Sequence, residues 1–129
     1  MILSGLFFRA IQMCTPLLLG SLGEVLVERT GVMNMAIEGI FLLGAWAGFT
    51  GAYLSGSLFM GFVCAMLTGV LTGALYGWIT VYLKQHQIVT GVALNILAAG
   101  LGIYLYRVLF GVPLLPLTVE SLKPLPVPV

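Results

Sequence analysis

Residues 39–83 read GIFLLGAWAGFTGAYLSGSLFMGFVCAMLTGVLTGALYGWITVYL and contain no charged side chain. These 45 residues lie between Glu38 and Lys84. As one helix rising about 1.5 Å per residue they would reach about 67 Å, roughly twice the ~30 Å hydrocarbon core of a bilayer. We therefore expect the stretch to fold back on itself at residues 51–57, GAYLSGS, which form its only turn-rich part. The stretch predicts two membrane spans.

The composition of the whole chain supports a membrane protein. Of 129 residues, 60% are hydrophobic and 7% are charged, and the mean hydropathy is +1.16. A typical soluble domain is about a quarter charged, and a domain of this size cannot enclose so much apolar surface. These values exclude a soluble monomer and a disordered chain. The net charge of +1 also excludes a nucleic-acid-binding module.

The charge-poor stretches predict four helical spans, with a different kind of segment after them. Helices are expected because an unpaired backbone amide in lipid is costly and the stretches are too long for barrel strands. The predicted fold is an all-α membrane region over residues 1–111, followed by a Pro-rich extracytoplasmic loop or truncated tail at 112–129, which holds five of the six prolines. The predicted spans are residues 8–27, 36–54, 58–83 and 88–110.

The few basic residues between the spans predict the orientation of the chain. Arg29 lies in the first connection and Lys84 in the third, whereas residues 55–57 in the second carry no charge. Basic residues favour the cytoplasmic side of a membrane. We expect Arg29 and Lys84 in the cytoplasm, both chain ends outside, and the protein in the cell membrane as a multi-pass protein.

Glycines recur at helical spacing in the predicted spans, and the chain holds 17 of them. Helices in lipid pack closely over small side chains because lipid tails leave no hydrophobic drive between them. Such packing would lie within the chain or on a dedicated dimer face, and the sequence does not separate the two. The glycines predicted to mark helix packing are Gly44, Gly48, Gly69, Gly73, Gly77, Gly91 and Gly102.

Two stretches combine polar residues with a membrane location. In the last span, Asn95 lies on one face with small residues, and Gln87 lies just beside this face. Asn95 forms either an interhelical hydrogen bond or part of a wet pathway. Before the second span, Asn34 and Glu38 belong to a broken helix that lines a pathway. Alternatively, Glu38 or Glu28 pairs with Arg29, or these carboxylates stay solvated. The candidate pathway residues are therefore Asn34, Glu38, Gln87 and Asn95.

No catalytic or metal-binding set is recognisable in the sequence. The single histidine, His86, stands alone, and G-x-S-x-G, H-E-x-x-H and P-loop motifs are absent from the sequence. We expect neither an enzyme nor a resident cofactor. One alternative function is a small ion- or proton-coupled carrier in which Glu38 titrates. Another is a membrane fragment that packs against other helices without transporting.

Three stretches resemble a known family when they are taken together. Residues 28–45, ERTGVMNMAIEGIFLLGA, resemble the signature of ABC-transporter permeases of the branched-chain amino acid and ribose type, and look closest to the nucleoside and simple-sugar subgroup. Residues 15–24, TPLLLGSLGE, and 87–101, QIVTGVALNILAAGL, are similar to the same pattern. His86 departs from it, since Asn is more often expected at that place.

The resemblance implies a permease subunit of an ATP-driven ABC importer, forming part of the channel for nucleosides or related simple sugars. It implies three protein partners, a second permease subunit, a cytoplasmic ABC ATPase and an extracytoplasmic solute-binding protein, and it places the chain in the lipid bilayer. Because family permeases are longer and carry a coupling helix that docks on the ATPase, the chain is expected to be the N-terminal portion of such a transmembrane domain.

Overall fold

The computed structural model describes residues 2–112 and 117–119, and in these ranges it contains helices and no strands. Four helices are long and apolar enough to span a membrane, so the predicted all-α membrane fold is confirmed. The predicted tail at 112–129 lies mostly outside the described residues. The helices are α1 (Ile2–Glu28), α2 (Ile37–Ser55), α3 (Leu58–Gly77) with its π-helical continuation η1 (Trp78–Tyr82), and α4 (Gln87–Phe110).

The helix boundaries follow the sequence closely except at the start of α1. The first span was expected from residue 8, but α1 begins at Ile2, since residues 2–8 contain no proline that would end a helix. Pro16 lies inside α1 without ending it, as membrane helices tolerate. In the turn that the sequence predicts at residues 51–57, α2 ends before Gly56. Gly56 takes a left-handed conformation with φ of 64°, which glycine adopts without steric cost.

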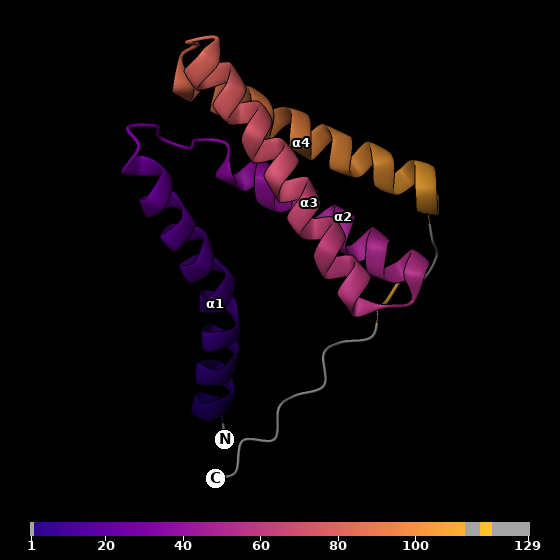
Figure 1. Cartoon of the computed structure of the whole chain (residues 1–129). Helices are drawn as coiled ribbons and strands as arrows, with labels where there is room; N and C mark the ends of the chain where they lie inside the picture. The colour runs from indigo at the N-terminus through magenta and orange to yellow at the C-terminus, as the bar shows by residue number, and fades with distance from the viewer. Residues whose placement is uncertain (1, 113–116, 120–129) are drawn as a thin grey trace.

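The four helices alternate in direction (Figure 1). The α1–α2 connection and the α3–α4 connection lie at one end of the molecule, and the α2–α3 turn lies at the opposite end. Arg29 and Lys84 therefore lie at the same end, as four crossings require. Which end faces the cytoplasm remains a prediction.

The packed part of the molecule is formed by α2, α3 and α4. Glycines allow α2 and α3 to approach closely: a Cβ atom built on Gly48 would lie 3.2 Å from the Cβ of Ala65, and one on Gly61 would lie 2.7 Å from the Cβ of Ala52. A Cβ atom on Gly44 would lie 3.8 Å from the carbonyl oxygen of Ala65 in α3. Close backbone approach is what small residues contribute to helix pairs in lipid.

Not every glycine in the predicted packing set has a neighbour in this chain. A Cβ atom on Gly69, Gly73, Gly77 or Gly102 would meet no described atom within 4 Å. These four positions therefore do not pack helices together among the described residues. A packing role toward another polypeptide remains a prediction for them.

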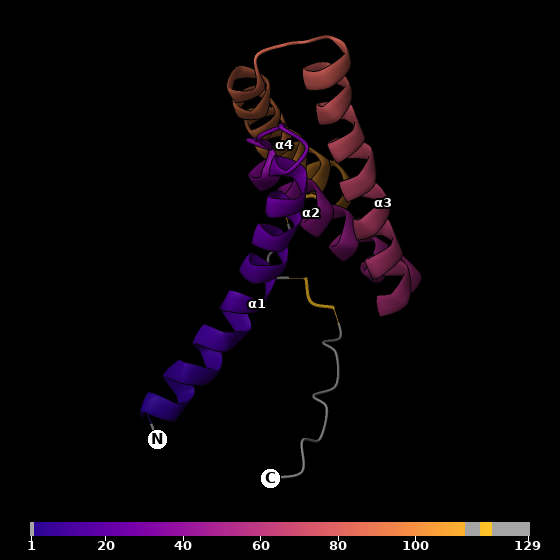
Figure 2. The same ribbon diagram turned by 60° about the vertical axis from the view of Figure 1, so that its left-hand side comes forward.

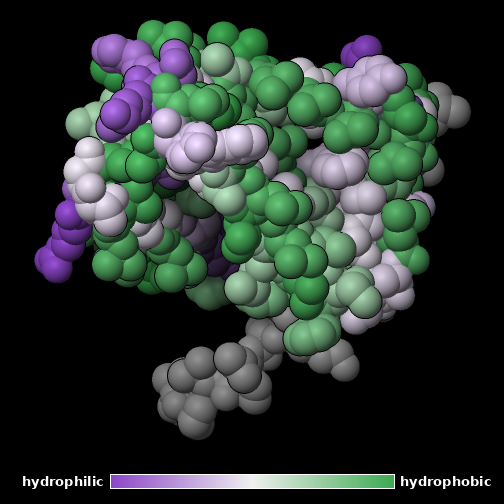
Figure 3. Space-filling view, turned by 45° about the horizontal axis from the view of Figure 1, so that its top comes forward, coloured by the Kyte–Doolittle hydropathy of each residue, from purple (hydrophilic) through white to green (hydrophobic). Residues whose placement is uncertain are grey.

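Helix α1 diverges from the other three helices (Figures 1 and 2). Its large apolar side chains from Leu6 to Leu26 are 49–74% exposed. Near its C-terminal end, Gly20 faces the ring of Phe41, which a Cβ at Gly20 would overlap. Hydrophobic residues cover most of the face drawn in Figure 3, which is hollowed near its centre. Such a surface fits lipid or further protein rather than water.

Candidate functional site

The chain between α1 and α2, residues 29–36, is not helical and is bonded to side chains of α1, α3 and α4. Gly31 turns the chain with a φ of +84°. Helix α2 has 19 residues, against 25 for Leu58–Tyr82 and 24 for α4, so it is shorter by about 8 Å at ~1.5 Å per residue. Irregular backbone at membrane depth requires polar partners from protein or water.

Side chains from three helices supply partners to the backbone of this segment. The N–H of Met33 donates to Gln87 Oε1 over 2.9 Å, and the N–H of Asn34 donates to Glu24 Oε1 over 2.8 Å. The hydroxyl of Tyr76 donates to the carbonyl of Met33 over 2.6 Å. The backbone amides that an α-helix would satisfy internally are thus bonded to side chains of α1, α3 and α4.

Asn95 binds the end of the segment with both halves of its amide. Its Oδ1 accepts the N–H of Gly39 over 2.7 Å, and its Nδ2 donates to the carbonyl of Met35 over 3.0 Å. Two glycines make room for this contact. A Cβ on Gly39 would lie 2.8 Å from Asn95 Oδ1, and a Cβ on Gly91 would overlap Met35.

The remaining two candidate pathway residues differ in their environment. Asn34 is half-buried, and its Oδ1 accepts the N–H of Ala36 over 3.2 Å, which closes a local turn. Glu38 is exposed in the first turn of α2, where the helix dipole favours an anion. Among the described residues no ion pair joins Glu38 to Arg29. The structure therefore brings Asn34, Gln87 and Asn95 together and leaves the side chain of Glu38 outside the cluster.

Two residues that bond to the same segment, Tyr76 and Glu24, were absent from the predicted pathway set. Tyr76 is only 3% exposed, and besides Met33 it lies 3.2 Å from the carbonyl of Gln87. Glu24 binds Asn34 with one carboxylate oxygen while the other, Oε2, is buried without a described partner. A tyrosine within an apolar span was a usable signal, because a buried hydroxyl needs a partner.

We name Glu24, Tyr76, Gln87 and Asn95, with the backbone of residues 33–39, the polar cluster. It lies where α1, α3 and α4 surround the start of α2. Its side chains bond to backbone groups of the non-helical residues 33–36 and of the first turn of α2. The described residues contain no group of three or more His, Cys, Asp or Glu that would hold a metal ion.

Known proteins match this chain over most of its length. The family described as branched-chain amino acid transport system / permease component matches residues 6–116. The chain belongs to this family. It is a transport-permease family rather than an enzyme family, and together with the four apolar helices it identifies this permease-family chain as a multi-pass protein of the plasma membrane.

Three relatives of this permease-family chain illustrate the range of the family. It is 37% identical over 98 residues to a putative glucose ABC transporter permease of Haloferax volcanii, which covers 76% of this chain and 30% of that protein. It is 35% identical over 102 residues to a nucleoside ABC transporter permease of Lactococcus lactis, covering 74% and 32%. It is 31% identical over 102 residues to a guanosine ABC transporter permease of Bacillus subtilis, also covering 74% and 32%.

The chain spans less than a third of the length of these relatives. No solved structure matches it.

Proposed function

We propose that the chain is a permease subunit of an ATP-driven ABC importer and forms part of the channel for nucleosides or related simple sugars. Its proposed partners are a second permease subunit, a cytoplasmic ABC ATPase and an extracytoplasmic solute-binding protein. The likeness to glucose, nucleoside and guanosine permeases supports this solute class.

The observation that carries the proposal is the polar cluster around the irregular segment. Backbone that is held by side chains of neighbouring helices, rather than by its own helix, can change its hydrogen bonds when those helices move. Glu24, Gln87 and Asn95 each bind one or two backbone groups. We propose that this segment borders the solute pathway and rearranges during transport.

The test is solute uptake in a strain that lacks the chain and in the same strain with the chain restored. Radiolabelled guanosine, uridine and glucose are supplied, and ATP is depleted while the membrane potential is held. We expect uptake of at least one nucleoside or sugar to require the chain and to stop without ATP. In the restored strain, Asn95→Leu is expected to lower that uptake, whereas the exposed control Ile96→Leu leaves it unchanged.

Two results would contradict the proposal. Uptake that continues without ATP, follows a pH gradient and disappears in Glu38→Gln would identify a small ion- or proton-coupled carrier. Uptake of all three solutes that is equal with and without the chain, while the chain still co-purifies with a longer permease, would identify a non-transporting membrane fragment.

A further inference from the structure

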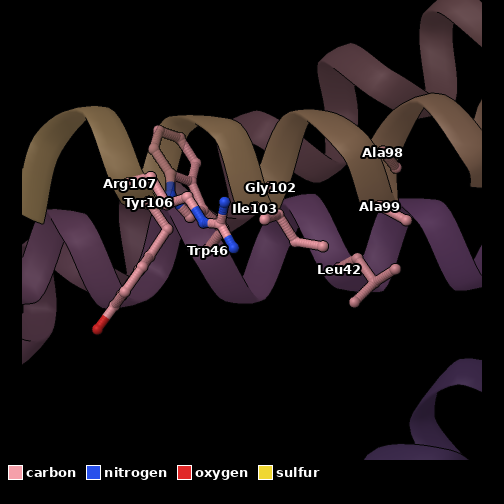
Figure 4. A pocket seen from close by; sticks show the side chains of 8 residues that line it. All are labelled: Leu42, Trp46, Ala98, Ala99, Gly102, Ile103, Tyr106 and Arg107. Atoms are coloured by element: carbon pink, nitrogen blue, oxygen red, sulfur yellow. The ribbon is translucent and has the colours of Figure 1, made fainter. Parts of the chain in front are cut away.

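A groove of about 430 Å³ runs between α2 and α4 (Figure 4). Leu42 and Trp46 line it from α2, and the small residues Ala98, Ala99 and Gly102 line it from α4. Trp46 is the tenth of the 19 residues of α2, so the groove reaches the middle of the span. No described segment covers it, and Leu42 is 45% exposed.

Two hydrogen-bond donors of this groove have no acceptor among the described residues, and one of them is buried. The indole Nε1 of Trp46 is buried and has no partner among the described residues. Arg107 lines the same groove, and its guanidinium reaches toward the Trp46 ring (Figure 4). Arg107 lies in the last turn of α4 and is exposed, and its side chain runs back along the groove, since side chains tilt toward the N-terminus of their helix.

The chemistry of the groove selects one kind of occupant. A lipid tail has no acceptor for the indole N–H and cannot neutralise a guanidinium, which is costly at membrane depth. A sugar or nucleoside would leave most of its hydroxyl groups without partners against walls of leucine, alanine and glycine. A membrane helix matches both requirements, because its apolar face packs over Ala98, Ala99 and Gly102 and one polar side chain supplies the acceptor.

We propose that the α2–α4 groove seats a further transmembrane helix of the permease, from outside residues 1–129, and that this helix carries a carboxylate that pairs with Arg107 and accepts the Trp46 N–H. The inference rests on the proposed function. The relatives have room for such a helix, since this chain covers only 30–32% of their length. A carboxylate with two donors is the combination that makes a buried charge tolerable in a membrane.

The test is photo-crosslinking in the native membrane with the full chain. Benzoylphenylalanine is placed at Leu42 or Ile103 in the groove, and at Leu71, which is 69% exposed on α3, as a matched control for the lipid background. Crosslinked peptides are identified by mass spectrometry. We expect both groove positions to capture the same apolar permease peptide with an Asp or Glu, at a yield above that at Leu71.

Two further variants test the carboxylate. Arg107→Glu is expected to lower the groove crosslink at least about tenfold, and replacing the captured acidic residue by Arg in the same strain restores it. Trp46→Phe keeps the ring and the packing but removes the N–H, so it is expected to lower the yield about threefold. This milder variant keeps the test valid if Arg107→Glu prevents folding.

The inference is overturned if the groove positions capture only lipid, residues 113–129 of the same chain, a second copy of the chain, or a peptide without an acidic residue. Yields that neither Arg107→Glu nor Trp46→Phe changes also overturn it. Solute uptake is measured in the unmodified strain in parallel. Chain-dependent uptake together with any of these results rejects the groove occupant alone, and loss of the uptake requirement rejects the proposed function.

Discussion

At the scale of single residues, the irregular segment depends on a few side chains that bond to backbone atoms. Asn95 makes two of these bonds, and the hydroxyl of Tyr76 lies within bonding distance of the carbonyls of Met33 and Gln87. Leaving a buried backbone group without its partner costs more than the bond itself contributes. These two residues are therefore where small substitutions have the largest expected effect.

Asn95→Leu removes the acceptor of the Gly39 N–H and the donor to the Met35 carbonyl without changing the side-chain size greatly. We expect the free energy of unfolding in detergent to fall by about 1–3 kcal/mol, since hydrogen bonds in membrane proteins contribute about 0.6 kcal/mol each and unpaired groups add to the loss. Thermal or SDS-induced unfolding followed by circular dichroism measures it. Ile96→Leu, at a side chain 70% exposed, should leave stability unchanged, and an equal loss in both variants would contradict the role of Asn95.

Tyr76→Phe keeps the buried ring and removes only the hydroxyl that bonds to Met33. The expected loss of stability is about 1 kcal/mol, with faster hydrogen exchange at the N–H of Met35, which donates to the Tyr76 hydroxyl over 3.4 Å. Tyr104→Phe, whose side chain is 64% exposed, provides the matched control. Exchange rates that Tyr76→Phe does not alter would show that the segment is held without this hydroxyl.

At the scale of elements, α2 and α3 form the closest helix pair, and glycines determine how close they come. Gly61→Val would place a branched side chain where even a Cβ meets Ala52 and the carbonyl of Gly48 at 2.7 Å. We expect this substitution to separate α2 from α3 and to destabilise the chain by about 1–3 kcal/mol. The same unfolding measurement checks it.

Gly73→Val, also on α3, gives a direct contrast because a Cβ atom on Gly73 would meet no atom of residues 2–112 or 117–119 within 4 Å. It should leave the stability of the purified chain within about 0.5 kcal/mol of the original. If it destabilises the purified chain as much as Gly61→Val does, the described helix packing is wrong.

The elements show what the sequence predicts and what it does not. The charge-free runs and Gly56 indicate where α2, α3 and α4 end. Both signals are local, because the hydropathy of a run and the preference of glycine for a left-handed backbone depend on neighbouring residues alone. Tyr76 was missed because its contact with Met33 joins residues 43 positions apart, and hydropathy carries no such pairing. The start of α1 at Ile2 was missed because hydropathy places a membrane span without marking the residue at which its helix begins.

For the candidate pathway residues, too, the sequence indicates some features and not others. Gln87 and Asn95 stand out because polar side chains are rare in apolar spans, and both meet the irregular segment. The exposed position of Glu38 depends on the rotation of α2 about its axis. That rotation follows from packing against α3 and α4, which the sequence of α2 alone does not specify.

At the scale of the whole molecule, the alternating helices predict which connections share a side of the membrane. In a chain with both cysteines replaced, a single cysteine at Ser57 should react with a membrane-impermeant maleimide from outside intact cells. One at Gln85 should react only after the membrane is opened. The reverse pattern would invert the predicted orientation, and labelling of both sites from one side would contradict four crossings.

One turn of α3 holds more residues than its neighbours: in η1 the N–H of Leu83 donates to the carbonyl of Trp78, five residues earlier. The additional residue shifts the start of the α3–α4 connection by one position along the helix. In an ordinary helix one position corresponds to a rotation of about 100°. Deleting a single residue between 78 and 82 would restore regular winding while re-aiming the α3–α4 connection. Because Gln87 begins α4 directly after this connection, we expect the deletion to displace Gln87 relative to Met33 and to weaken the hydrogen bond between them.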